Sequence, residues 1–123
     1  MANEPLQILA YGAQQTVGPV EVPYDILNPQ LSTTADAVAT GGTISTSGVT
    51  VARVAPTAAV TGVILEPGEY PGKRLTVVNE AASADSVTFA AAGTSNVALG
   101  TSAVIAGQAS LTLTWNPFLG LWM

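Results

Sequence analysis

Few residues in this chain could carry chemistry. The 123-residue sequence contains no histidine and no cysteine. Histidine is the usual general base near neutral pH, and cysteine is the usual activated nucleophile and thiolate metal ligand. Serine and threonine are abundant, but their hydroxyl groups need a neighbouring base before they can act as nucleophiles. The sequence therefore offers no nucleophilic pair, no thiolate site and no disulfide.

Carboxylates are the remaining candidates for acid–base chemistry or metal binding. Glu66, Glu69 and Glu80 flank predicted turns, where an acidic side chain is more often solvated than catalytic. Calcium can be held by oxygen ligands alone, but calcium loops have a regular ligand spacing. The aspartates that could contribute show no such spacing: Asp25, Asp36 and Asp85. We therefore expect a protein that is not an enzyme and that binds no cofactor or metal ion.

Charge is scarce along the whole chain. Charged residues make up 9% of the sequence and the net charge is −5, whereas about 25% is usual for a soluble domain. A lone monomer would have few charged side chains on its surface. We therefore expect further copies or a partner to cover much of that surface. The basic residues are only Arg53, Lys73 and Arg74, too few to neutralise nucleic acid or to bind an acidic membrane surface.

The N-terminus carries no targeting pattern. The residues after Met1 lack the basic and apolar regions of a secretory signal. No apolar run approaches the roughly 18 residues needed to span a bilayer. We expect neither a membrane nor a nucleic acid among the partners.

Residues 1–33 differ in composition from the rest. Pro5, Pro19, Pro23 and Pro29 punctuate short apolar runs, and proline removes a backbone donor and disfavours helix before it. This pattern predicts an extended N-terminal arm that lays apolar side chains onto another molecule. The alternative is that residues 6–10 form the first strand of the main sheet and the rest is an ordinary loop.

Residues 34–123 are predicted to form one all-β domain. The segment 32–48, rich in small residues, reads as a linker or a weak first hairpin. Short strand-like runs follow at close spacing: 48–54, 60–65, 73–78, 86–90, 104–105, 109–115 and 119–123. Pro-Gly pairs at 67–68 and 71–72 each suit a type II turn. Helical turns have room only at 35–40 and 90–92. The pattern predicts a small antiparallel β-sandwich or barrel.

The C-terminal end is predicted to be a closing hairpin. Leu111, Leu113 and Trp115 alternate with polar residues, as in a strand with one buried face. Pro117 and Gly120 then favour a turn that pairs this strand with the chain end.

Four large aromatic residues fall in this domain: Phe89, Trp115, Phe118 and Trp122. Each can bury roughly 150–250 Å², so most are expected to fill the protomer's own core. The alternative is that Phe118 or Trp122 packs at an oligomer interface, near a subunit axis.

The C-terminal half resembles the head-fibre and capsid-decoration proteins of tailed bacteriophages. The resemblance runs from near Val60 to the end of the chain. It lies in Gly62-Val-Ile-Leu-Glu-Pro-Gly68, the Pro71–Glu80 strand, the Ser86–Val97 segment and the terminal Leu-Trp. It implies a small β-domain, commonly trimeric, seated on the outer face of an icosahedral shell.

From these observations together we expect a capsid-decoration (cement) protein. It would be made in the host bacterial cytoplasm, form a homotrimer and bind the major capsid protein on the outer surface of a phage head. The candidates for contact with a shell subunit are the large apolar residues of the arm: Leu6, Ile8, Leu9, Tyr24, Ile26 and Leu27.

A second class of function fits the same composition. A carbohydrate- or receptor-binding β-module of a virion would use Trp115, Trp122 or Tyr70, if exposed, to stack on sugar rings. A hydrolase is excluded because the residues for it are absent.

Overall fold

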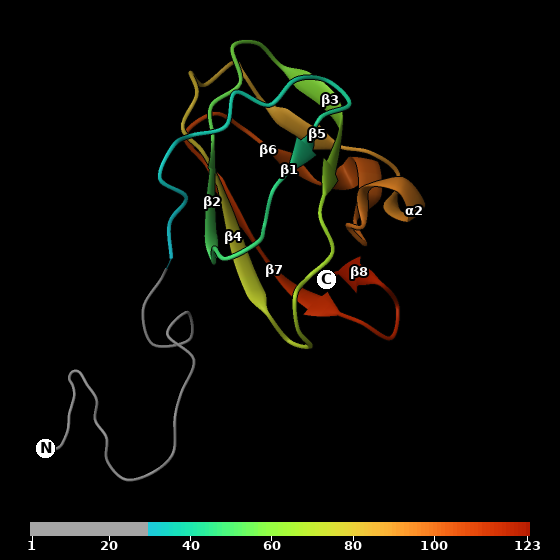
Figure 1. Ribbon diagram of the computed structural model, residues 1–123. Coiled ribbons are helices and arrows are strands. Elements are labelled where there is room, and N and C mark those ends of the chain that lie inside the picture. Colours follow the sequence, from blue (N-terminus) through green and yellow to red (C-terminus); the bar gives the residue numbers. More distant parts are fainter. Residues whose placement is uncertain (1–29) are drawn as a thin grey trace, which may run out of the picture.

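The strand-like runs form two four-stranded sheets in the computed structural model, which describes residues 30–123 (Figure 1). One sheet has the order β1 (Thr43–Ile44), β3 (Val60–Leu65), β5 (Val87–Phe89) and β6 (Val104–Ile105). The other has the order β2 (Val51–Val54), β4 (Arg74–Asn79), β7 (Ser110–Asn116) and β8 (Leu121–Trp122). Two short turns of helix, α2 (Ala92–Ser95) and the 3₁₀ turn η1 (Gly100–Ser102), follow β5. The predicted all-β sandwich is confirmed.

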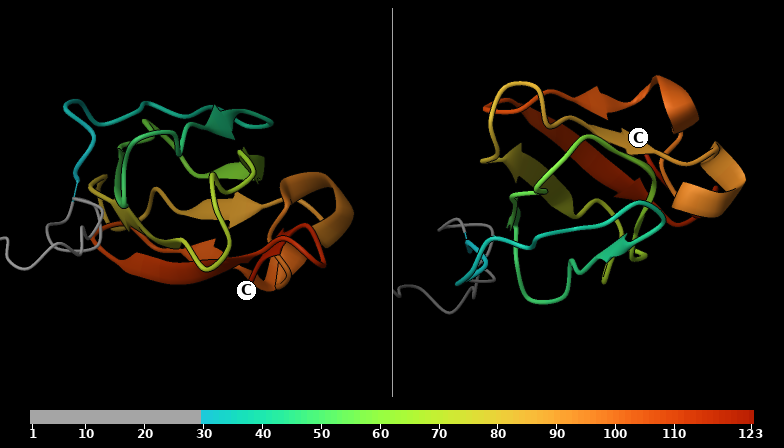
Figure 2. Two further views of the ribbon diagram at one scale, coloured as in Figure 1. Left: turned by 60° about the horizontal axis from the view of Figure 1, so that its bottom comes forward. Right: turned by 90° about the horizontal axis from the view of Figure 1, so that it is seen from above.

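The sheets are mixed, so the predicted antiparallel arrangement is wrong for part of the fold. From β1 to β5 each strand is followed by one in the opposite sheet (Figure 2). Strands that neighbour each other within a sheet therefore run the same way, and β1–β3, β2–β4 and β3–β5 are parallel. Antiparallel pairs arise only with the strands that follow β5, namely β5–β6, β4–β7 and β7–β8.

The chain joins the sandwich along the outer edge of β2. Leu31 and Asp36 form parallel bridges to Val51 and Val54, and the amides of Thr50 and Val51 both donate to the carbonyl of Gln30. Residues 30–36 therefore cover an edge that would otherwise be free to pair with another chain. The rest of the predicted arm, residues 1–29, lies outside the described residues.

Within the segment 32–48, predicted as a linker or weak hairpin, residues contribute to both sheets. Asp36 bridges to β2, and β1 pairs in parallel with β3. No two strands within this segment pair with each other.

Alternation along the strands builds the core. In β4, Leu75 and Val77 are fully buried, and in β7, Leu113 and Trp115 point inward as predicted. The sequence left open which face of β2 is buried, and the structure turns Ala52 and Val54 inward. The other fully buried apolar side chains come from both sheets and meet between them: Val63, Leu65, Val87, Phe89, Val97 and Trp122.

The predicted closing hairpin is confirmed. Trp115 pairs with Trp122 across β7 and β8, and their rings lie 5.4 Å apart between centroids at an angle of 59°. Trp122 is fully buried. Its indole N–H donates to the carbonyl of Glu66 at 2.8 Å, so the one polar atom of this side chain is satisfied inside the protein.

Only one of the two Pro-Gly pairs forms the predicted type II turn. Gly72 has a φ of +77°, and the Lys73 amide donates to the Tyr70 carbonyl at 3.2 Å. Gly68 has no positive φ, so the prediction at 67–68 is wrong. Gly68 is needed for space instead, because a Cβ there would lie 2.2 Å from Cγ of Trp115.

We expect Trp122→Ala to lower the free energy of unfolding by about 3–5 kcal/mol, because it leaves a large cavity and an unpaired carbonyl at Glu66. Urea denaturation followed by far-ultraviolet circular dichroism measures the change. An unchanged midpoint would place the side chain outside the core.

Candidate functional site

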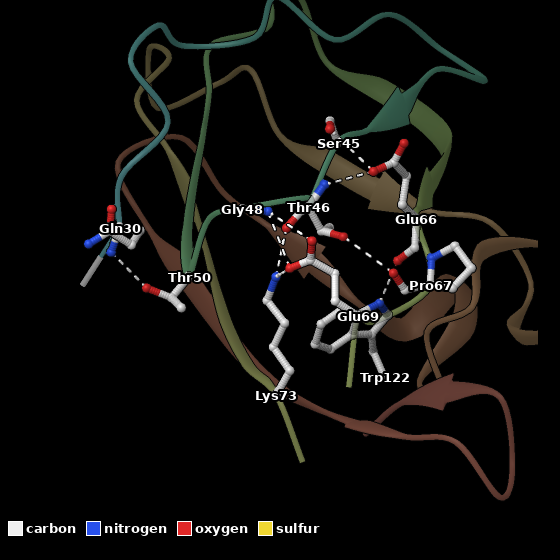
Figure 3. A network of polar contacts seen from close by, with 10 residues as sticks. All are labelled: Gln30, Ser45, Thr46, Gly48, Thr50, Glu66, Pro67, Glu69, Lys73 and Trp122. Carbon is white, nitrogen blue, oxygen red and sulfur yellow. Dashed lines mark hydrogen bonds and ion pairs between the residues drawn. The ribbon is translucent and has the colours of Figure 1, made fainter. Parts of the chain in front are cut away.

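Lys73 is the most deeply buried charged residue among residues 30–123. Its side chain is 1% exposed. Its ammonium donates to Oε1 of Glu69 at 2.6 Å and to the carbonyl of Thr46 at 2.8 Å (Figure 3). The Glu69 carboxylate also accepts from the amide of Gly48. The ammonium charge is thus neutralised and hydrogen-bonded where it is buried, which its burial requires.

Glu66 extends the same network towards the hairpin. Its carboxylate accepts from the Thr46 amide at 3.0 Å and from the Ser45 hydroxyl at 3.2 Å. Its carbonyl accepts the indole N–H of Trp122. We call Thr46, Gly48, Glu66, Glu69 and Lys73 the Lys73 clasp. The clasp ties the β1–β2 connection to the β3–β4 connection (Figure 3), so its carboxylates hold loops together.

Arg53 and Glu80 form the second ion pair of the described residues. Nε and Nη2 of Arg53 donate to the two carboxylate oxygens of Glu80 at 2.7 and 3.0 Å. This bidentate hydrogen bond and the charge of Arg53 hold the pKa of Glu80 below its usual value, and the same contacts raise the pKa of Arg53. The pair joins β2 to the end of β4 on the outer face of the sheet.

Asn79 is fully buried at the end of β4. Its amide nitrogen donates to the carbonyls of Asp85 and Ile105, and its amide oxygen accepts from the Ala81 amide. The Asn79 side chain therefore ties β4 to the β6 strand of the opposite sheet. Glu80, which was expected to be solvated beside a turn, is exposed but ion-paired.

Sequence reasoning missed the buried polar side chains of Lys73 and Asn79, although a signal for these two exists. Lys73 and Asn79 are in phase with Leu75 and Val77, which the period of two already turns inward. The whole inward row of this central strand is therefore polar at its two ends and apolar between them.

The β7–β8 hairpin tip presents apolar side chains to solvent. Phe118 is 95% exposed and Leu119 is 59% exposed. The Asn116 side chain accepts hydrogen bonds from the amides of both residues, at 2.9 and 3.2 Å, and its carbonyl accepts from the Gly120 amide. These bonds fix the backbone of the tip without burying either apolar side chain.

The structure separates the two residues predicted as interface candidates. Trp122 is fully enclosed by its own protomer, so it is not available to contact another copy, whereas Phe118 projects outward. The predicted shell-contact residues lie outside the described residues: Leu6, Ile8, Leu9, Tyr24, Ile26 and Leu27.

Charge is unevenly distributed in this chain. Every charged residue lies in residues 1–85, and residues 86–123 contain none. The uncharged part supplies β5, α2, η1, β6, β7 and β8. Among the described residues, it also holds every exposed large apolar side chain except Leu31: Leu99, Val104, Phe118, Leu119 and Met123.

Residues 30–123 offer neither a metal cluster nor a membrane-spanning helix. No group of three or more acidic side chains there could hold a metal ion. No helix in this part of the chain has the length and apolarity to cross a membrane.

Comparison with known proteins gives one match. The family model of the phage depolymerase C-terminal beta sandwich domain matches residues 31–123, which is nearly all of the described sandwich. No curated protein and no solved structure matches the chain significantly.

The Lys73 clasp predicts an order of stability among three variants. Glu69→Ala leaves a buried ammonium without its counter-charge, so it should lower the unfolding free energy by about 1–3 kcal/mol. Lys73→Met removes the charge with little change of shape and should cost less. The double variant should match Lys73→Met. Urea denaturation of the three variants tests this order, and a Lys73→Met variant less stable than Glu69→Ala would contradict it.

Proposed function

The chain belongs to the family of phage depolymerase C-terminal β-sandwich domains, and from this premise we propose that it is a capsid-decoration protein. Membership makes it a structural protein associated with a bacteriophage virion. The finer proposal is that it forms a homotrimer on the outer surface of the phage head and stabilises the shell as cement. The family match is the observation that supports the virion association, and the position on the head, the trimer and the cement role are our proposal.

The way the chain enters the sandwich supports this role. The family match begins at Leu31, the residue that bridges to Val51 at the edge of β2. Residues 1–30 are therefore additional to the matched domain. In our proposal their apolar residues contact neighbouring shell subunits, while the sandwiches associate with one another.

The proposed mechanism is adhesion. An arm that crosses two shell subunits adds buried surface, which must be exposed again before the shell can separate there. A ligand that binds only the assembled state stabilises that state by mass action. Three arms joined through one trimer raise the effective concentration of each contact, so that weak individual contacts add up to durable binding.

The carboxylates support a role without catalysis. Glu69 and Glu80 are each neutralised in an ion pair, and Glu66 accepts hydrogen bonds from a backbone amide and a hydroxyl. These contacts stabilise the fold, which is the role that we propose for the three carboxylates.

The burial of the tryptophans favours adhesion over sugar binding. The alternative function needs an exposed aromatic platform, and Trp115 and Trp122 were two of its three predicted members. Trp115 is only 9% exposed and Trp122 is fully buried. Of the three predicted members, this leaves Tyr70, which is half-buried.

Deleting residues 2–29 tests the role of the arm. The deletion keeps Gln30 and its hydrogen bonds to β2, so we expect a folded sandwich with an unchanged oligomeric mass. Co-sedimentation with empty phage heads should fall to background for this variant and not for the full chain. As a control, Leu31→Ser in the full chain should still bind. Retained binding of the deletion variant would refute the role of the arm.

A further inference from the structure

We infer that copies of this chain associate through the uncharged end of the sandwich, with the Phe118 side chain close to the symmetry axis. We define the uncharged end as residues 92–102, which contain α2 and η1, together with the β7–β8 hairpin and Met123. The inference rests on the proposed function in that it takes the protein to be an oligomer, and it names the surface and residues by which the oligomer forms.

The elements of the uncharged end lie together in space. Val97, just after α2, bridges in parallel to Trp122 of β8, and the Ala98 amide donates to the Trp122 carbonyl. Figures 1 and 2 show α2 and the hairpin on the same side of the molecule. Leu99 follows directly on Ala98 and precedes η1, so this exposed residue and those of the hairpin belong to one end of the sandwich.

The composition of this end is that of a covered surface. No residue of α2, η1 or the hairpin is charged, and Leu99, Phe118, Leu119 and Met123 are all more than half exposed. The core of a protein interface is depleted of charged residues and enriched in aromatic residues and methionine. Apolar side chains gathered on a surface of this kind mark a contact with another molecule.

The charge distribution identifies a second copy as the partner. A symmetry axis brings identical groups of different copies close together, and identical charges repel each other. All carboxylate side chains of the described residues lie in residues 36–85, namely Asp36, Glu66, Glu69, Glu80 and Asp85, and residues 86–123 contain none. At the uncharged end, several copies can therefore contact each other without this repulsion between identical charges.

The hairpin tip is already held in a fixed shape. The Asn116 side chain and carbonyl bind the amides of Phe118, Leu119 and Gly120, and the Trp115–Trp122 pair anchors the base of the hairpin. A side chain presented on a fixed backbone loses little conformational entropy when it is covered. Phe118 therefore has the features of an interface anchor: it is aromatic, almost fully exposed and rigidly mounted.

A pair of charge insertions in the full-length chain tests the inference. Phe118→Glu places identical charges near the proposed axis. Leu31→Glu is the matched control, because Leu31 is also an exposed apolar residue, at 57%, but lies at the opposite edge of the sheet, beside β2. Size-exclusion chromatography with light scattering measures the mass of each protein over a range of concentrations. Near-ultraviolet circular dichroism of the buried tryptophan pair verifies that each variant is folded.

We expect the wild type and Leu31→Glu to share one oligomeric mass, and Phe118→Glu to fall to the mass of a single folded chain. A monomeric wild type, a Phe118→Glu variant of wild-type mass, or dissociation of both variants would overturn the inference. Head binding is scored separately by co-sedimentation. A wild type that binds heads as a monomer refutes the inference and the proposed homotrimer, but keeps the proposed role on the phage head. If the wild type is an oligomer, Phe118→Glu is a monomer and the wild type does not bind heads, the inference is kept and the proposed function is refuted.

Discussion

The inward face of β4 is the constraint on which the rest of the sandwich depends. This strand lies inside its sheet, between β2 and β7. Its inward positions are Leu75, Val77 and Asn79, and Lys73, directly before the strand, continues the same row. The apolar pair fills the core. The polar residue at either end is buried, so each must find partners inside the protein. Lys73 finds them in the β1–β2 and β3–β4 connections, and Asn79 finds them around β6. The same row of side chains therefore contributes to the apolar core and, through hydrogen bonds at its two ends, holds the surrounding connections and β6 in place.

The few charged residues of the chain are also arranged in a consistent way. Two of the three cations are committed to intramolecular ion pairs, Lys73 with Glu69 and Arg53 with Glu80, and residues 86–123 carry no charge. Strands of this uncharged segment belong to both sheets, but the exposed apolar side chains of the hairpin and of η1 gather at one end. We propose that this virion-associated β-sandwich has two distinct contact regions, namely residues 1–30, which precede the matched domain, and the uncharged end at β8. In our proposal one region holds the shell and the other holds further copies.

Much of the fold could be read from the sequence, because alternation and turn residues are local signals. The strand that ends in Trp115, its pairing with the segment of Trp122 and the turn at Gly72 all followed from such signals. The parallel pairs did not, because they depend on the order in which strands cross between sheets, which no local pattern specifies. Gly68 was assigned to a turn because its actual constraint, contact with Trp115, is made by a residue distant in sequence. For the interface, composition alone pointed equally to Phe118 and Trp122, and only burial separated them.

The salt dependence of self-association tests the central claim most directly, since contacts between charges weaken as salt rises and burial of apolar surface does not. Sedimentation equilibrium of the full-length chain between about 0.01 and 1 M sodium chloride, where the screening length falls from roughly 30 to 3 Å, supplies the measurement. Association through the uncharged end predicts an oligomer that persists or tightens as salt increases, because screening also reduces the repulsion between acidic copies. An oligomer that dissociates as salt increases, or no oligomer at any salt concentration, would contradict the account.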